Sequence, residues 1–343
     1  MAKTLGVLTG GGDCPGLNPA IRAVTRRVLM GGLTVLGIKN GWRGLVENDT
    51  TPLTFDAISG IVHRGGTILG TSRTNPYQQP EELKKLLETY RTLKLDALVA
   101  IGGEDTLGVA AKLVKEGLHV VGIPKTIDND LSMTDVTFGF DTAVNIAMEA
   151  IDRLHTTAES HHRIMVVEVM GRHAGWIAVH AGIAGGADFI LIPEVEIDLQ
   201  QVCESIKKRH ARGKSFSIIV VAEGAKFNDG TMVAKAGKLD AFGHVRLGGV
   251  GQVLADRIEE DTGFETRVTV LGHIQRGGSP TAFDRVLSTR FGIKAAELVL
   301  AGHFGKMVSL QGNHIVAVPL DEQAVTMRTV DPEFYNLAKI FFG

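Results

Sequence analysis

The sequence predicts an α/β fold with mainly parallel sheets, and three observations support this prediction. Short apolar runs rich in β-branched residues alternate with helical patterns along the chain. Several of these runs end in glycine-rich polar segments, as at the carboxyl ends of strands where open parallel sheets bind ligands. The chain has 343 residues, which is long for one core and predicts two domains, or two lobes that share a sheet edge.

The first predicted strand, residues 3–9, leads into the glycine-rich loop Gly10–Asp13 and then into a helix from about residue 18 to residue 30. A strand, a glycine loop and a helix start can hold phosphates on backbone N–H groups. The loop is neither a dinucleotide fingerprint, since the third glycine falls on Pro15, nor a Walker A loop. A plain tight turn explains this motif equally well when it is read alone.

A second glycine-rich polar stretch, residues 63–73, lies between a predicted strand at 33–38 and a predicted helix at 80–93. It ends in Arg73, which has no carboxylate nearby in the sequence and could therefore bind a phosphate. Read alone, a solvated surface arginine is the simpler interpretation of this residue.

The central segment contains two strands that each deliver charged residues. The run 96–101 stops at Gly102 and Gly103, after which Glu104, Asp105 and Thr106 open a helix; the run 119–123 is expected to stop at Pro124. Parallel strands place both of the following loops at one sheet edge. This edge would carry more charge than packing alone requires, from the residues Glu104, Asp105, Lys125, Asp128 and Asp130.

The later elements continue the alternation. An amphipathic pattern at 140–154 indicates a helix packed on the core, and a second helix is expected at 200–211. Further strands are predicted at 164–169, 189–192, 217–222 and 268–271. Glycine and arginine follow two of these strands, in residues 170–175 and 272–278, and the polar stretch 226–251 is expected to be a surface insertion.

Composition excludes several classes of protein. A formal net charge of −2 gives no global attraction for nucleic acid or for anionic membranes, so any polyanion site must be local. No stretch of 18 apolar residues is present, and the start of the chain does not resemble a signal peptide. Two cysteines, Cys14 and Cys203, are too few for a disulfide framework. We therefore expect a cytoplasmic protein that binds neither nucleic acid nor membrane.

The loop ends gather the groups that phosphoryl transfer requires: carboxylates for Mg²⁺ and for a base, cations for the transferring group, and glycine loops. No G-x-S-x-G motif supports a hydrolase triad, and the 12 histidines form no H-E-x-x-H zinc site. The tripeptide Gly213-Lys214-Ser215 precedes a strand, so it is not the end of a Walker A loop.

Six strings carry a resemblance to a known family: LTGGGDCPGLN, RGGTILGTSR, IGGEDT, PKTIDND, EVMGRHAGW and LGHIQRGGSP. In this order and over nearly the whole chain, they resemble the phosphofructokinase family. The resemblance implies that family's fold, two Rossmann-like lobes with mainly parallel sheets. It assigns residues 1–139 and about 275–325 to a phosphoryl-donor lobe, and about 140–274 and 326–343 to a fructose 6-phosphate lobe.

The resemblance also implies transfer of a phosphoryl group to the 1-hydroxyl of fructose 6-phosphate. Asp128 would be the general base, with Lys125, Asp105 and Arg172 completing the catalytic group. The donor would be bound by Gly11, Gly12, Arg73, Gly103, Asp105, Thr106 and Lys125. The sugar phosphate would be bound by Thr126, Asp128, Asp130, Arg163, Met170, Gly171, Arg172, Glu223, Arg267, His273 and Arg276. Of these, Arg163 and Arg267 match arginines that reach the 6-phosphate from a neighbouring subunit, so we expect a homodimer or homotetramer with shared active sites.

Two departures from the common ATP-using pattern indicate the donor. Asp105 replaces a glycine against which a nucleotide would lie, and Lys125 replaces a second glycine. The pair resembles the pyrophosphate-dependent branch, and a carboxylate at position 105 would repel the α-phosphate of ATP. Glu104 replaces the aspartate that binds Mg²⁺ and can still coordinate this cofactor. The alternative that Asp105 is only a first-turn helix residue, favoured by the helix dipole, stays open.

Three further hypotheses remain at this point. An ATP-dependent 6-phosphofructokinase is the first alternative to pyrophosphate dependence. A non-catalytic regulatory subunit that binds sugar phosphate is the second, although such a protein need not keep Asp128. The family's allosteric forms bind effectors in a basic pocket. Arg22 and Arg26 match that pocket here, but His155 stands in place of an arginine, so we expect a non-allosteric enzyme.

Overall fold

The computed structural model describes residues 3–228, 234–239, 245–247 and 249–343. The chain divides into two compact units, and each is described by itself. Unit 1 comprises Met1–Ile127, Leu131–Asp141 and Arg276–Met327. Unit 2 comprises Asp128–Asp130, Thr142–Gln275 and Arg328–Gly343.

Unit 1 is built on one mostly parallel sheet. Its strand order is β14 (His314–Pro319), β13 (Lys306–Gln311), β5 (Val120–Thr126), β4 (Leu95–Gly102), β1 (Thr4–Thr9), β2 (Thr34–Ile38) and β3 (Thr50–Pro52). The short strand β6 (Phe138–Gly139) adds to the end of β5. Antiparallel pairing occurs only at the two edges, between β13 and β14 and between β2 and β3, among the strands described in this sheet.

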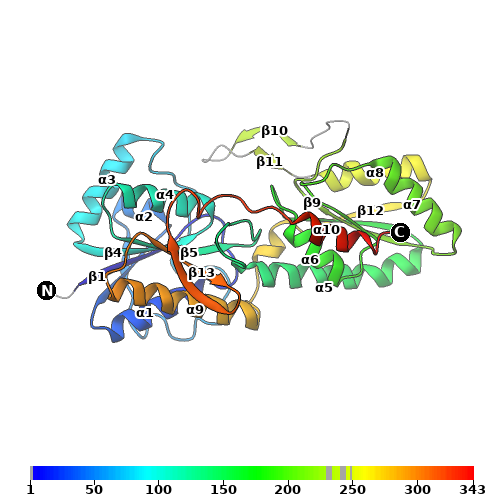
Figure 1. Cartoon of the computed structure of the whole chain (residues 1–343). Helices are drawn as coiled ribbons and strands as arrows, with labels where there is room; N and C mark the ends of the chain where they lie inside the picture. Colours follow the sequence, from blue (N-terminus) through cyan, green and yellow to red (C-terminus); the bar gives the residue numbers. More distant parts are fainter. Residues whose placement is uncertain (1–2, 229–233, 240–244, 248) are drawn as a thin grey trace. The chain divides into compact units, whose positions relative to one another are not determined.

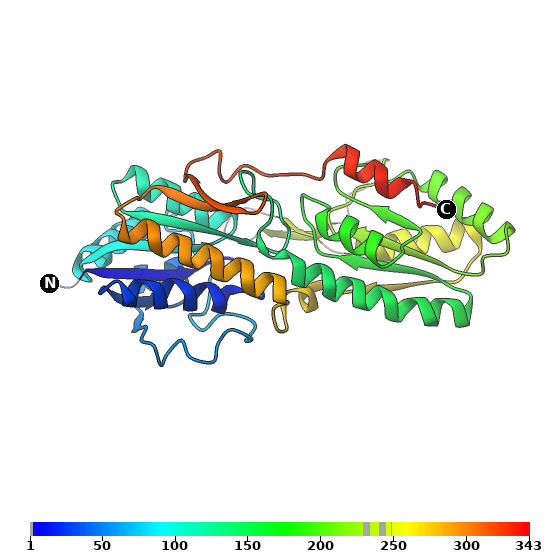
Figure 2. The same ribbon diagram turned by 60° about the horizontal axis from the view of Figure 1, so that its bottom comes forward.

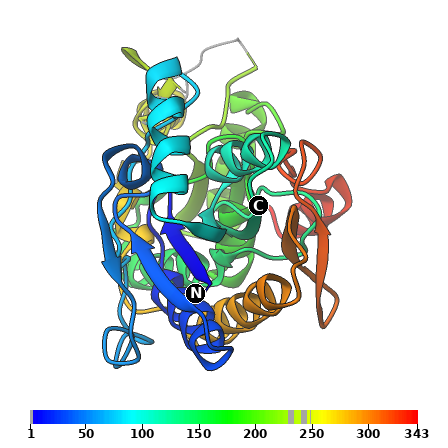
Figure 3. The ribbon, with the colours of Figure 1, turned by 90° about the vertical axis from the view of Figure 1, so that its left-hand side faces the viewer.

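Helices cover both faces of this sheet, which explains why its central strands are apolar throughout. Helices α1 (Leu17–Met30) and α9 (Ala282–Leu300) lie side by side on one face (Figures 2 and 3). On the other face are α2 (Trp42–Glu47), α3 (Pro80–Thr92) and α4 (Glu104–Lys115). The strand β4 shows the consequence, because every residue from Ala97 to Gly102 is buried.

Unit 2 contains a smaller sheet that is parallel throughout. Its strand order is β12 (Thr266–Val270), β7 (Ile164–Val169), β9 (Ser217–Ala222) and β8 (Phe189–Leu191). Helices α7 (Leu199–Ala211) and α8 (Val250–Thr262) share an apolar cluster with one face, and α6 (Trp176–Ala184) packs on β8 and β9 (Figure 1). The remaining described elements are α5 (Phe140–His161), α10 (Pro332–Lys339), η1 (Gly272–Arg276), and the hairpin of β10 (Ala234–Leu239) and β11 (Val245–Leu247).

The predicted α/β fold with mainly parallel sheets is confirmed. The expected insertion at 226–251 lies partly outside the described residues; the part that is described contains β10 and β11. The expectation that a strand stops at Pro124 is wrong, because β5 continues through Pro124 to Thr126. The pairing of β13 with β5 ends at Gly122, so Pro124 leaves no ladder bond to β13 unmade.

The last part of unit 1 was not predicted from the pattern of residues. Helix α9 is apolar on more than one side: Phe291 is buried, whereas Phe283, Val286 and Ile293 are exposed. Such a helix has no single apolar stripe, so the periodicity of its residues does not reveal it.

Within the described part of the chain, no helix combines the length and the apolar character needed to cross a membrane.

Candidate functional site

The glycine loop after β1 is held between two neighbouring segments of unit 1. The N–H of Gly10 donates to the Ile101 carbonyl (2.9 Å), and the N–H of Gly11 donates to the Ser72 carbonyl (3.2 Å). The Thr71 hydroxyl donates to the Gly11 carbonyl at 2.5 Å. Gly11 has φ +76°, a left-handed conformation that favours glycine. The loop is therefore fixed by its neighbours, and exposed Arg73 follows directly after the residues that hold it.

The start of α4 lies against this loop. Thr106 is 2% exposed, and a Cβ on Gly10 or on Gly102 would lie 2.5 or 2.3 Å from its side chain. Only glycine allows this approach, so the first turn of α4 sits directly beside the loop. Glu104 is exposed and Asp105 is half-buried in that turn, and Gly103 is the N-cap residue. Both the glycine loop and α4 follow the carboxyl ends of adjacent parallel strands, as the sequence predicted.

Lys125 joins β5 to the glycine loop. Its side chain is 3% exposed, and its ammonium group donates a hydrogen bond to the Gly12 carbonyl. A Cβ placed on Gly11 would lie 3.8 Å from the same nitrogen. A buried ammonium group is costly unless it is well partnered. The ammonium of Lys125 is therefore fixed at the loop, which suits binding of a compact anion.

Arg276 brings a second cation to the same loop. Its Nη1 donates to the Asp13 carbonyl at 3.4 Å, and a Cβ on Gly12 would lie 2.3 Å from that nitrogen. The resemblance assigned Arg276 to the sugar phosphate, whereas within unit 1 it lies against the predicted donor loop.

The sequence Thr126 to Asp130 makes a tight turn. Asn129 is buried with φ +52°, and asparagine tolerates this left-handed conformation better than most residues. The side chains of Asp128 and Asp130 are half-buried on either side of it. The Asp130 carbonyl accepts a hydrogen bond from the N–H of Arg328 at 2.8 Å, which fixes the turn within unit 2.

The carboxyl ends of β7, β9 and β12 gather most of the predicted sugar-phosphate residues of unit 2. Met170, Gly171 and Arg172 follow β7, and Glu223 follows β9. The N–H of Glu223 donates to the Val169 carbonyl (2.9 Å), and Gly171 has φ +136°. His273 is exposed in η1, two residues after Leu271, whose N–H donates to the Glu168 carbonyl (3.0 Å).

Arg163 and Arg267 lie at the opposite end of the unit 2 sheet, where strands β7 and β12 begin (the amino edge). Arg163 precedes β7, and Arg267 is the second residue of β12, paired with Met165. Strand β7 has six residues, so it separates Arg163 from Met170 by roughly 20 Å. Arg163 Nε lies 2.8 Å from a Glu265 oxygen, and Arg267 Nη2 contacts the same carboxylate. Unit 2 therefore does not bring these arginines together with Arg172 and Glu223.

Ion pairing lowers the pKa of Glu265. The hydrogen bond from Arg163 is the main cause. Burial opposes it as the next largest effect, and the charges of both arginines and the hydrogen bond from Arg267 lower the pKa further. The two arginines and Glu265 thus form one charged cluster at the amino edge of β7 and β12.

The carboxylate of Glu104 suits a metal ion that binds together with the phosphates of a substrate. Among the described residues, no group of three or more histidine, cysteine, aspartate or glutamate side chains could hold a metal ion. Mg²⁺ commonly binds one or two carboxylates together with substrate phosphates and water. An exposed carboxylate beside a phosphate-binding loop is sufficient for that mode, and Glu104 supplies one.

Cys14 lies under the glycine loop and is not a reactive thiol. Its Sγ contacts the Phe138 carbonyl at 3.7 Å, and its side chain is fully buried. Burial is the main cause that raises the pKa of this thiol to about 12, and the charges of Lys125, Asp284, Arg276 and Asp13 modify it. A protonated, buried thiol packs as a small apolar group.

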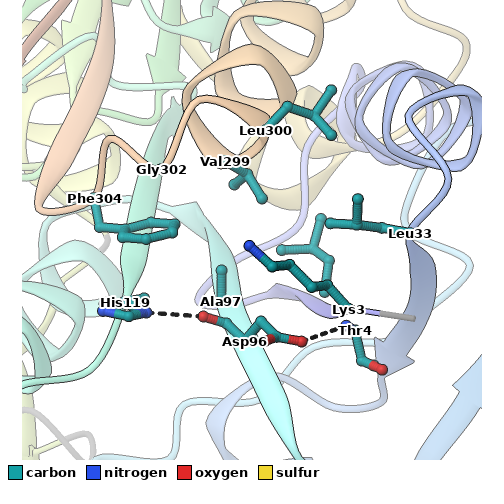
Figure 4. A pocket seen from close by; sticks show the side chains of 11 residues that line it. Lys3, Thr4, Leu33, Asp96, Ala97, His119, Val299, Leu300, Gly302 and Phe304 are labelled. Atoms are coloured by element: carbon teal, nitrogen blue, oxygen red, sulfur yellow. Dashed lines mark hydrogen bonds between the residues drawn. The ribbon is translucent and has the colours of Figure 1, made fainter. Parts of the chain in front are cut away.

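A cavity of about 150 Å³ lies at the other end of the large sheet (Figure 4). It opens beside the amino ends of β1 and β4, where the N–H of Thr4 donates to Asp96 at 2.7 Å and His119 bonds the Asp96 carbonyl at 3.0 Å. The rings of His119 and Phe304 stack with centroids 4.2 Å apart. Open parallel sheets usually bind ligands at the carboxyl ends of their strands, and this cavity lies at the opposite end.

Residues expected from the effector pocket are engaged in packing. In unit 1, Arg26 lies over the ring of Phe55, 5.6 Å from its centroid. In unit 2, His155 bonds the Gly185 carbonyl at 2.7 Å and meets the edge of Phe216.

The sequence did not predict the residues that hold the backbone of the candidate site in place. Thr71 and Ser72 hold Gly11, but their role depends on a fold that brings β1 and the 63–73 stretch together. Asp284 is completely buried near Cys14 and bonds the N–H of Gly139, 145 residues away in sequence. No local pattern distinguishes it from an ordinary first-turn aspartate of α9.

Comparison with known proteins shows the family to which the chain belongs. The family model for phosphofructokinase matches residues 4–299. The chain is 59% identical to a pyrophosphate–fructose 6-phosphate 1-phosphotransferase of Streptomyces coelicolor, over 99% of each chain. It is 52% identical to an ATP-dependent 6-phosphofructokinase of Mycobacterium tuberculosis, again over 99% of each chain. A phosphofructokinase of Pichia pastoris in the T-state superposes with a TM-score of 0.84 at 35% identity, covering 99% of this chain and 39% of that one. The chain therefore belongs to the phosphofructokinase family.

Proposed function

We propose that the chain is a pyrophosphate-dependent 6-phosphofructokinase. It transfers a phosphoryl group reversibly from pyrophosphate to the 1-hydroxyl of fructose 6-phosphate, giving fructose 1,6-bisphosphate and phosphate. Unit 1 binds the donor, and the carboxyl edge of the unit 2 sheet binds the sugar phosphate. Relatives that are named for each of the two donors match at 59% and 52% identity, so the donor is argued from residues.

The pair Asp105 and Lys125 carries the choice of pyrophosphate. Asp105 adds a second carboxylate to the first turn of α4, beside the glycine loop. A nucleotide would bring its α-phosphate and adenosine toward this charge, whereas pyrophosphate has neither. Lys125 fixes a cation at the Gly12 carbonyl, where it suits a small, highly charged donor and a phosphate leaving group. Gly11, Gly12, Gly103 and Thr106 form the cradle, and Arg73 extends it.

The acceptor side supplies a base and anion-binding groups. The 1-hydroxyl oxygen of the sugar attacks a phosphorus of pyrophosphate, and the bridging P–O bond of pyrophosphate breaks. Asp128 accepts the proton that the hydroxyl loses. Thr126 and Asp130 flank this base in the same turn. Arg172 stabilises the charge that develops on the transferring group. The remaining sugar-phosphate contacts come from Met170, Gly171, Glu223, His273 and Arg276.

Glu104 is the residue that would hold Mg²⁺ together with the donor phosphates. When bound, Mg²⁺ neutralises part of the phosphate charge. Removal of divalent cations with a chelator should abolish turnover, and added Mg²⁺ should restore it.

The placement of Arg163 and Arg267 supports a shared active site. Both lie at the amino edge of the unit 2 sheet, away from Arg172 and Glu223, so another subunit's sugar-phosphate site is a suitable target for them. We therefore propose a homodimer or homotetramer. Both cysteines are free, which fits a reducing cytoplasm.

Product formation with fructose 6-phosphate and Mg²⁺ tests the proposal, with pyrophosphate and ATP assayed in parallel. Pyrophosphate should be the preferred donor by kcat/KM. The variant Asp128→Asn, measured in the same assay, is the control for contaminating activity. Preference for ATP would support the ATP-dependent alternative. Binding of the sugar phosphate without turnover of either donor would indicate the regulatory alternative.

A further inference from the structure

The short strand β6 supports the end of β5 in unit 1. It has two residues, Phe138 and Gly139, which pair in parallel with Lys125 and Thr126. The Thr137 hydroxyl adds a hydrogen bond to the Thr126 carbonyl at 2.8 Å. The backbone that carries Lys125 is therefore held on one side by residues 137–139, and any movement of β6 would be passed to it.

A buried carboxylate fixes β6 in turn. Asp284 is 0% exposed, and its Oδ1 accepts the N–H of Gly139 at 2.9 Å. Gly139 has φ +98°, and a Cβ there would lie 2.5 Å from the Cys14 sulfur, so only glycine fits at this position. The hydrogen bond to Asp284 therefore holds the backbone at a point where no larger residue could stand.

Asp284 itself belongs to a rigid base. It lies in the first turn of α9, where the Thr281 hydroxyl caps its N–H at 3.2 Å and also donates to Asp141 at 2.6 Å. Helix α9 packs along α1, and a Cβ on Gly292 would lie only 2.7 Å from the Ala20 carbonyl. The side chains of Asp284 and Thr281, at the start of α9, therefore hold residues 139 and 141 against the helix pair of α1 and α9.

We propose that Asp284 is a positioning residue for Lys125. Its carboxylate oxygen anchors Gly139, β6 transmits the anchor to the paired backbone of Lys125 and Thr126, and the ammonium group of Lys125 is thereby held at the Gly12 carbonyl. The role depends on the acceptor oxygen and not on the charge. The inference rests on the proposed function, because it assigns Lys125 to the pyrophosphate donor.

Two substitutions of Asp284 distinguish a role as hydrogen-bond acceptor for Gly139 from a general contribution to stability. Asp284→Asn keeps an oxygen for the Gly139 N–H, and its kcat should stay within about threefold of the wild-type value. Asp284→Ala removes the acceptor, and it should lower kcat by about 10- to 100-fold and raise the KM for pyrophosphate, since a misplacement of ~1 Å at a reacting group has such effects. The KM for fructose 6-phosphate should change less than the KM for pyrophosphate in either variant, because unit 2 supplies most of the sugar-phosphate contacts and, of them, only Thr126 pairs with β6.

Asp188 provides a matched control. It is a buried carboxylate in unit 2 that accepts the N–H of Ile218 at 2.9 Å and pairs with Arg209 at 2.8 Å. Asp188→Ala should lower the melting temperature as much as Asp284→Ala does, yet leave kcat and the pyrophosphate KM unchanged. Should Asp284→Ala fail to fold, Thr137→Val tests the same chain of contacts, because it removes the hydroxyl that bonds the Thr126 carbonyl. This variant should also lower kcat, with a smaller change in the KM for fructose 6-phosphate than in the KM for pyrophosphate.

The outcomes are distinct. Absence of pyrophosphate turnover in the wild-type enzyme would reject the proposed function itself. With an active wild type, equal damage in Asp284→Asn and Asp284→Ala would overturn the inference, because the charge would then matter more than the acceptor. Unchanged kcat in a folded Asp284→Ala, or in Thr137→Val, would overturn it as well.

Discussion

Single residues set the chemistry of this protein, and the proposed base is the one with the simplest test. Asp128 lies in the turn that follows β5, with Asn129 in a left-handed conformation beside it. That geometry comes from the backbone, so a change of the Asp128 side chain should leave the turn in place.

Asp128→Asn should lower kcat by about 10²–10⁴, the usual contribution of a general base. Affinity for fructose 6-phosphate, measured by calorimetry, should change by only a few-fold, because the amide keeps the size of the carboxylate. Near-normal turnover in this variant would contradict the assignment of Asp128.

The donor prediction concerns two residues of unit 1. Asp105→Gly should improve the use of ATP, because it removes both bulk and like charge from the first turn of α4. Lys125→Gly should mainly reduce turnover of pyrophosphate, since the fixed cation at Gly12 is lost. The double variant should shift the ratio of kcat/KM values for ATP and pyrophosphate further than either single change. An unchanged ratio in the double variant would sink this account of donor choice.

At the scale of elements, the edges of the unit 2 sheet have separate roles. Its carboxyl edge carries the loops with Arg172, Glu223 and His273, and its amino edge carries the cluster of Arg163, Arg267 and Glu265.

The contribution of this cluster to stability depends on pH in a way that can be measured directly. Glu265 has a lowered pKa in the folded protein, so its ion pairs stabilise the fold above the ordinary glutamate pKa of about 4.3. This contribution is lost as the pH falls through the lower, folded value.

A carbon-13 NMR titration of labelled glutamate should therefore find the Glu265 midpoint below about 4.3. Arg163→Ala should move the midpoint upward more than Arg267→Ala does, because the hydrogen bond from Arg163 is the larger cause. Equal shifts in both variants would contradict that order of causes.

At the scale of the whole molecule, the amino-edge arginines lead to the prediction of a shared site. An Arg163→Ala chain and an Asp128→Asn chain should each be inactive as parents. Mixed oligomers should regain part of the wild-type activity, because one type of site in the hybrid combines an intact base with an intact arginine. The measurement is turnover after dissociation and reassembly of the mixture, with each parent treated alone as the control. Hybrids that assemble but stay inactive would show that the sites are not shared in this way.

The sequence by itself predicted the fold class, which is confirmed, and it named most residues of the candidate site, whose roles stay predictions. Strands such as 164–169 and 217–222 were predicted to their ends because buried parallel strands are continuous apolar runs bounded by polar loops. Glycine loops and charged residues at strand ends were visible for the same local reason. The donor choice could be argued from two residues, Asp105 and Lys125, since it depends on charge and size at known motif positions.

Only the tertiary structure decided which groups support the site and which residues lie apart. The bond from Asp284 to Gly139 and the packing of α9 on α1 join segments more than 100 residues apart, and the two-residue strand β6 pairs with the end of β5; no local periodicity encodes such contacts. Pro124 was expected to end β5, but whether a proline breaks a strand depends on its neighbours in the sheet. The pairing of Arg267 with Met165, which puts Arg267 at the same end of the sheet as Arg163, likewise depends on the register between strands far apart in sequence.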